Sequence, residues 1–131
     1  MAGPGDTLAT PYALETFRLI KKEFPGIIKC MSTNGLMLPD YYQEIIDVGI
    51  DSLTVTVNAV DPLIQERICG EITYHGKRYQ GVEAAGILIE NQLSGIEAVA
   101  GAGVTVKVNT VLIPEINAGH VETVAKTVAG K

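Results

Sequence analysis

The sequence is short of basic side chains and of cysteine, and it has no long apolar run. Lys and Arg number 10 against 15 Asp and Glu, a formal net charge of −5, so the chain lacks the basic surface that nucleic-acid binding requires. No apolar run approaches the roughly 18 residues of a membrane span, and no signal peptide opens the chain. We therefore expect a cytoplasmic protein with neither nucleic acid nor a membrane as partner.

The two cysteines, Cys30 and Cys69, lie far apart and make no metal-ligand spacing by themselves. A disulfide between them is one alternative. A reduced pair agrees better with a cytoplasmic chain, and we expect both thiols to be reduced.

The apolar content of 47% and the 14 glycines are typical of a globular α/β protein. Thr10 is the expected N-cap of the first helix, with Pro11 at its first position, and Tyr42 is expected to face inward from the second. His75-Gly76 is the expected turn of a small hairpin. Helices are predicted at 11–24, 39–48, 62–69, 83–99 and 118–129.

Three segments are predicted strands: one that starts in the apolar run 27–29 and has Cys30 at its carboxyl end, then the alternating segments 50–58 and 104–112. The last two repeat one pattern of helix, glycine, alternating strand and terminal asparagine, which is typical of βα units in a barrel. Right-handed connections would place the three strands side by side in parallel. We therefore predict a partial parallel (βα) barrel of about three strands with flanking helices, its polar strand faces turned inward. Three strands leave open edges, which predicts a fragment or self-association.

Small polar residues follow each strand, where parallel sheets place ligand groups. Hydroxyls and amides suit a polar, zwitterionic or ribose-bearing ligand, and no nucleophile–base pair accompanies them. Lys107 could form a Schiff base in an aldolase-like barrel if it were buried; an interior lysine paired with a carboxylate is the alternative. The expected rim consists of Gly3, Gly5, Asp6, Ser32, Thr33, Asn34, Thr56, Asn58, Lys107 and Asn109.

The segments Gly-Pro-Gly-Asp (3–6), Cys-Met-Ser-Thr-Asn-Gly-Leu (30–36), Thr-Val-Thr-Val-Asn (54–58) and Lys-Val-Asn-Thr-Val (107–111) resemble radical S-adenosylmethionine (SAM) enzymes. Residues 74–85 are similar to the branch that builds the nitrogenase iron–molybdenum cofactor. The resemblance covers nearly all 131 residues in order. It implies that the chain is a single fragment, 1–131, from the middle of the family's partial barrel.

The resemblance also implies roles for the rim. Gly3, Gly5 and Asp6 match the loop that holds the SAM amino group, and Cys30 matches a ligand of a substrate iron–sulfur cluster. Cluster donors and cofactor-assembly carriers are the implied partners of the complete enzyme. The remaining positions implied to contact SAM are Ser32, Thr33, Asn34, Thr56, Asn58 and Asn109.

The family's CxxxCxxC loop, which binds the 4Fe–4S cluster that cleaves SAM, is absent from the sequence, and Cys30 and Cys69 cannot replace it. The family's last strand is also expected to be missing. We therefore expect a radical SAM fragment that is inactive alone, with no catalytic residue of its own. The alternatives are a non-catalytic α/β binding or scaffold module, and a fragment of another radical SAM enzyme such as an activase.

Overall fold

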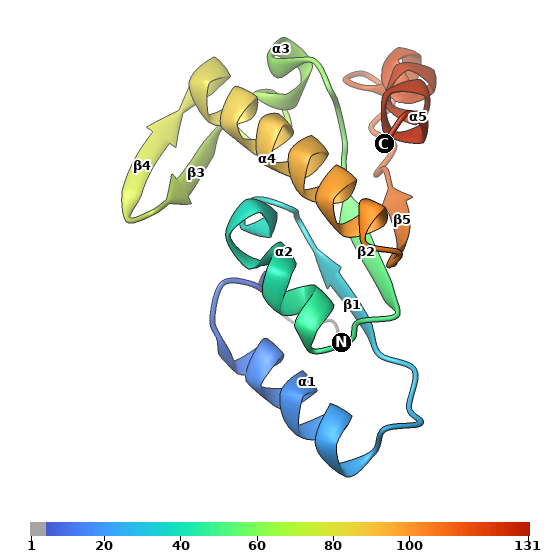
Figure 1. The fold of residues 1–131 in the computed structure, drawn as a ribbon. Coiled ribbons are helices and arrows are strands. Elements are labelled where there is room, and N and C mark those ends of the chain that lie inside the picture. The colour runs from blue at the N-terminus through green and yellow to red at the C-terminus, as the bar shows by residue number, and fades with distance from the viewer. Residues whose placement is uncertain (1–4) are drawn as a thin grey trace.

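The computed structural model describes residues 5–131, in which a three-stranded parallel sheet carries its helices on one face (Figure 1). Among the helices of residues 5–131, none combines the length and the hydropathy of a membrane span. In chain order the elements are α1 (Tyr12–Glu23), β1 (Cys30–Thr33), α2 (Leu38–Asp47), β2 (Ser52–Thr56), α3 (Pro62–Gln65), β3 (Glu71–Tyr74), β4 (Lys77–Gln80), α4 (Gly81–Gly101), β5 (Thr105–Asn109), the 3₁₀ turn η1 (Ala118–His120) and α5 (Val121–Ala129).

The sheet has the order β1-β2-β5, and all neighbours are parallel, as the alternating segments predict. In its register Thr33 lies beside Val55, and Thr56 lies beside Asn109. Strand β2 is therefore central, and all three carboxyl ends meet at one edge of the sheet. Among residues 5–131, β1 and β5 each pair with one strand only, so self-association through their outer edges stays a prediction.

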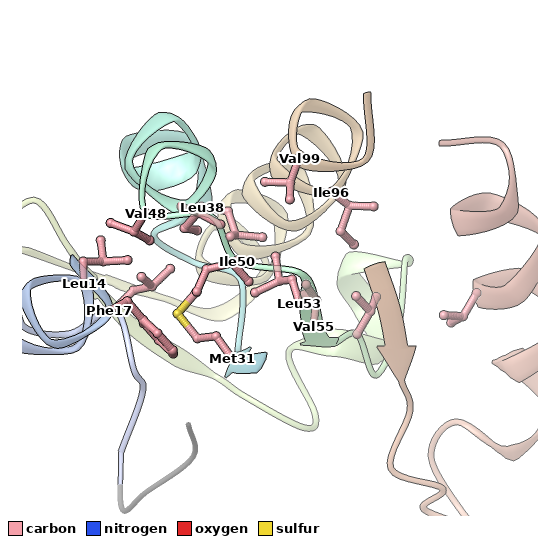
Figure 2. Close-up of a cluster of buried hydrophobic side chains, with 14 residues drawn as sticks. Leu14, Phe17, Met31, Leu38, Val48, Ile50, Leu53, Val55, Ile96 and Val99 are labelled. Carbon is pink, nitrogen blue, oxygen red and sulfur yellow. The ribbon is translucent and has the colours of Figure 1, made fainter. Parts of the chain in front are cut away.

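The hydrophobic core lies between the apolar face of the sheet and the helices (Figure 2). Met31 of β1 and Leu53 and Val55 of β2 are each at most 1% exposed. Phe17 of α1 and Val99 of α4 belong to the same cluster. Each fully buried side chain of this size contributes about 1.5–3 kcal/mol to the free energy of unfolding. Because right-handed βαβ connections that keep their helices on one side curl a sheet toward closure, this arrangement agrees with a partial α/β barrel.

The polar face of the sheet differs from the prediction. Thr54 and Thr56 are half-buried there, whereas Thr105 and Lys107 are exposed. In the part of the chain described, no helix covers this face. Lys107 is exposed in this part of the chain, so the burial that both of its expected roles require is not observed here, and both roles stay predictions.

Two details of the predicted helices are also wrong. Helix α1 begins at Tyr12, and Thr10 does not cap it, because Pro11 already has helical backbone angles and accepts the bond from Glu15 N at 3.0 Å. Tyr42 is 38% exposed, because it lies at the margin of the buried stripe of α2, which runs through Leu38 and Ile45.

The ends of the third helix and the hairpin follow the sequence more closely. Asp61 caps α3 by accepting a hydrogen bond from Leu63 N at 2.8 Å, although the helix already ends at Gln65. The hairpin β3–β4 turns at His75-Gly76, as predicted. The His75 ring stacks on Tyr74 and its Nε2 lies 3.0 Å from Asp40 Oδ1, so the turn contacts α2.

Gly95 lies at a close approach of α4 to α2, because a Cβ built there would lie 2.2 Å from Leu38 Cβ. We expect Gly95→Ala to lower the free energy of unfolding by about 1–3 kcal/mol through overpacking. The matched control is Gly86→Ala on the same helix, where an added Cβ meets nothing within 4 Å and should stabilise by up to about 1 kcal/mol. Urea denaturation measures both, and equal effects would contradict the close contact.

Candidate functional site

The carboxylate of Asp6 holds the carboxyl end of β1. Its oxygens accept hydrogen bonds from Leu8 N at 2.9 Å, from the Thr33 hydroxyl at 2.9 Å and from Asn34 N. The Thr33 hydroxyl in turn accepts from Gly35 N at 3.1 Å. The carboxylate of Asp6 is therefore engaged in hydrogen bonds that fix the chain after β1, so Asp6 is a positioning residue of this edge.

A small hollow of about 170 Å³ lies beside this carboxylate, and we call it the Asp6 cavity. It brings together the predicted rim residues of the first loop, of the end of β1 and of the end of β2. These are Gly5, Asp6, Ser32, Thr33, Asn34 and Thr56. Six of the predicted SAM-contacting positions thus surround one space.

Two hydroxyls at the Asp6 cavity are unused by the protein. Within residues 5–131 neither Ser32 nor Thr56 forms a side-chain hydrogen bond, and both are half-buried. The main chain at Gly5 is unobstructed by other residues, because a Cβ built there meets nothing within 4 Å. The cavity therefore offers hydroxyl and backbone groups to a polar ligand.

Two other predicted residues, Asn58 and Asn109, lie outside this cavity. Asn58 borders a second, larger hollow, and its Oδ1 accepts from Val111 N at 2.9 Å. Asn109 is exposed and pairs with Thr56 across the sheet without bordering either hollow. Gly3 lies outside the described residues, so its predicted role stays a prediction.

Cys30 stands at the beginning of β1, not at its carboxyl end as predicted. Its side chain is exposed and shares the polar face with Ser32, about 7 Å along the strand. The half-buried thiol of Cys69 donates to the Glu71 carbonyl oxygen at 3.3 Å, so the two cysteines form no disulfide with each other.

Gln92 on α4 is a site residue that the sequence prediction missed. It is 2% exposed, and its Nε2 donates to the main-chain oxygens of Asn34 at 2.6 Å and Thr56 at 2.9 Å. It packs so closely on Gly35 that a Cβ there would lie 2.7 Å from Gln92 Cγ. One signal in the sequence could have identified it. Gln92 follows Leu88 by four residues and so lies on the buried stripe of an apolar helix, where a side-chain amide requires hydrogen-bond partners.

Asn117 was missed in the same way. It is fully buried, accepts from Ile113 N at 2.7 Å, and donates to the main-chain oxygens of Asn58 at 2.9 Å and Val111 at 2.8 Å. These bonds join the chain after β2 to the chain after β5.

The family model of the radical SAM superfamily matches residues 1–128. The chain belongs to the radical SAM superfamily, which confirms the resemblance carried by its strand-end motifs.

Within that family, similar proteins include FeMo cofactor biosynthesis proteins NifB. The chain is 48% identical over 126 residues to NifB of Methanocaldococcus jannaschii, covering 96% of this chain and 42% of the relative. It is 44% identical over 131 residues to NifB of Frankia alni, covering 99% of this chain and 26% of the relative. The chain thus spans less than half the length of these relatives.

Family membership and the NifB relatives imply SAM and a 4Fe–4S cluster as the cofactors of a complete protein of this kind. The hydroxyls and open main chain at the Asp6 cavity fit the polar groups of SAM. The residues do not fit the 4Fe–4S cluster, because the sequence contains two cysteines in place of a three-cysteine loop. Within residues 5–131 no group of three or more His, Cys, Asp or Glu residues is placed to hold a metal ion.

Asp6→Ala should release the chain after β1. Because several charge-assisted hydrogen bonds are lost at a half-buried site, we expect a loss of about 2 kcal/mol in the free energy of unfolding and faster hydrogen exchange at the Asn34 amide. The control is Asp47→Ala, which removes an exposed carboxylate that accepts one bond from Gln43 and should change stability by less than about 0.5 kcal/mol. Unchanged exchange at Asn34 would show that Asp6 does not position this edge.

Proposed function

We propose that this chain supplies the central part of the SAM-binding domain of a radical SAM enzyme that assembles the nitrogenase iron–molybdenum cofactor. The observation that carries this proposal is the similarity to NifB proteins over nearly the whole chain, at 40–48% identity in the relatives from Methanocaldococcus jannaschii, Frankia alni and Chlorobaculum tepidum. The three parallel strands would then be part of a larger barrel, whose interior is the polar face that is open here.

In this proposal the Asp6 cavity holds part of SAM. The main chain at Gly5 and Asp6 would receive the amino group, and the unused hydroxyls of Ser32 and Thr56 would bind other polar groups. Asn58, two residues after Thr56, would contact the ribose or the carboxylate of SAM. The hollow of about 170 Å³ is smaller than typical small-molecule sites of about 300–1000 Å³, so these residues would form one side of a larger pocket.

Cys30 would act on the substrate. Its exposed thiol lies on the same polar face as Ser32, and a thiolate in that position is suited to ligating an iron–sulfur cluster that is to be converted into the cofactor precursor. In the complete enzyme the reaction would insert a SAM-derived carbide into fused clusters. Cluster donors and cofactor carriers would be the partners, in the cytoplasm.

The first test is calorimetric titration of the anaerobically purified chain with SAM. We expect saturable binding that is about fivefold weaker in Thr56→Val, because the variant keeps the shape of the side chain and loses one hydrogen bond of about 1 kcal/mol. Thr54→Val is the matched control, since Thr54 lies two residues earlier on the same face of β2 and borders neither hollow.

Two results would contradict the SAM site. One is the absence of binding heat at millimolar SAM with folded protein. The other is an equal loss of affinity in Thr54→Val and Thr56→Val, which would indicate a general effect on β2 in place of a contact at the Asp6 cavity.

A second test concerns the chemistry. The chain alone, supplied with iron, sulfide, reductant and SAM, should leave SAM uncleaved, because it lacks the three thiolates that hold the cleaving cluster. Chromatography of the nucleoside products measures this, with an enzyme that carries the CxxxCxxC loop as positive control. Cleavage above the protein-free background would show that Cys30 and Cys69 assemble a competent cluster after all.

A further inference from the structure

His120 accepts a hydrogen bond that only a neutral imidazole can accept. Its Nε2 lies 3.1 Å from the main-chain nitrogen of Val60, and an N–H group of the main chain can only donate. Nε2 of His120 is therefore unprotonated, and the proton of the neutral ring stands on Nδ1. The contact fixes the tautomer of His120, and it cannot form when both ring nitrogens carry protons.

This bond joins two segments that are far apart in sequence. Val60 lies on the chain after β2, and His120 ends η1, directly before α5. Asn117 joins the same two segments, because its Nδ2 donates to the Asn58 carbonyl oxygen at 2.9 Å. The His120 amide in turn donates to the Asn117 carbonyl oxygen at 2.9 Å. Of these three bonds, the one between Val60 and His120 involves a titratable side chain.

Beyond this junction, helix α5 is attached through few contacts. A groove of about 550 Å³ lies among α4, β5 and α5, with Val106 and Val108 of β5 in its wall. Val124 of α5 is 2% exposed and belongs to the core, and Lys131 at the end of the chain pairs with Glu97 of α4 at 2.8 Å. The bond to the His120 ring stands at the beginning of this helix, so its loss affects how α5 is held.

The charged groups around the junction do not replace this bond. The chain after β2, α3, the loop before η1 and the first turn of α5 carry Asp61, Glu66, Arg67, Glu115 and Glu122. Asp61 caps α3, Arg67 donates to the Glu115 carbonyl oxygen, and Glu122 pairs with Lys126. Within residues 5–131 none of them forms an ion pair with His120. Since most are carboxylates, they favour a proton on the ring without restoring the acceptor that Val60 N requires.

We propose that His120 is a pH-sensitive lock that holds η1 and α5 on the chain after β2. Histidine is the side chain whose charge ordinarily changes between about pH 5 and pH 8. When Nε2 takes up a proton, it becomes a donor that faces the Val60 N–H, and neither donor then has a partner in this half-buried place. The lock is therefore closed at the upper end of this pH range and opens as the pH falls. This device goes beyond the proposed function and does not depend on SAM binding.

The second histidine of the chain responds in the opposite direction. His75 Nε2 lies 3.0 Å from Asp40 Oδ1, which can only accept, so the ring donates in this contact. Protonation of His75 keeps that bond and adds an attraction between opposite charges. Acid should therefore strengthen the contact between the hairpin and α2 while it breaks the contact between His120 and Val60.

The test is hydrogen exchange of the complete chain, followed by NMR without SAM at about pH 7.5 and about pH 5. The reference is the Val57 amide, which donates to the Asn109 carbonyl oxygen at 2.9 Å in a bond without a titratable group. We expect the protection of the Val60 amide, relative to Val57, to fall about fivefold at the lower pH, and the amides of α5 to lose protection with it.

Two variants separate the acceptor from its titration. His120→Gln supplies a neutral acceptor of similar reach, so the Val60 amide should stay protected at both pH values. His120→Phe keeps a ring without an acceptor, and protection should be low at both. His75→Gln is the matched control and should leave the pH dependence at Val60 unchanged.

Equal protection of the Val60 amide at both pH values in the unmodified chain would overturn the proposal. A fall that persists in His120→Gln would also overturn it, as would a fall at Val60 with the amides of α5 unchanged. Where the variants do not fold, the side-chain nitrogen shifts of the unmodified chain decide, since a proton on Nε2 of His120 at the higher pH would contradict the lock. None of these results bears on the Thr56→Val comparison, so the two proposals fail separately.

Discussion

The side-chain amide of Gln92 is the link on which the whole strand-end region depends. It reaches from α4 to the main-chain oxygens of Asn34 and Thr56, and so joins the ends of two neighbouring strands to one helix. The bonds require Gln92 to pack against Gly35, where an added Cβ would come within 2.7 Å of it. Glycine at this position and glutamine at 92 therefore form one structural unit. Asn34 and Thr56, which both border the Asp6 cavity, owe their position to it.

The sheet explains why that region faces open space. The buried face of β2 packs on helices that precede it in sequence and on helices that follow it. In the described residues no helix lies over the polar face. A sheet in a doubly wound fold is covered on both faces and has apolar residues on both. The threonines at 54 and 56 and the asparagine at 109 are instead suited to an interior that contains ligand and water. Parallel strands with helices on one face thus agree with barrel membership on grounds independent of sequence similarity.

The periodic features of the fold could be predicted from the sequence, and the isolated polar residues could not. Alternation at 50–58 and 104–112 identified parallel strands, and His75-Gly76 identified a hairpin, because both signals are local. Gln92 and Asn117 bond to main-chain groups far away in sequence, which no local pattern encodes. Lys107 occupies a strand position whose exposure depends on what covers that face, so the alternation of the strand could not decide its burial. The site was identified at the level of loops and strand ends, and its individual contacts were not.

The distribution of unused hydrogen-bonding groups separates residues that build the site from residues that serve a ligand. Some side chains form their hydrogen bonds with the protein itself and so fix the loops; these are Asp6, Asn117 and, through its Nε2, Gln92. Within residues 5–131 the half-buried hydroxyls of Ser32 and Thr56 form no hydrogen bond with the protein. Because these hydroxyls border a hollow and the protein does not use them, they remain available to the polar groups of a ligand, which is the role that the proposed SAM site gives them.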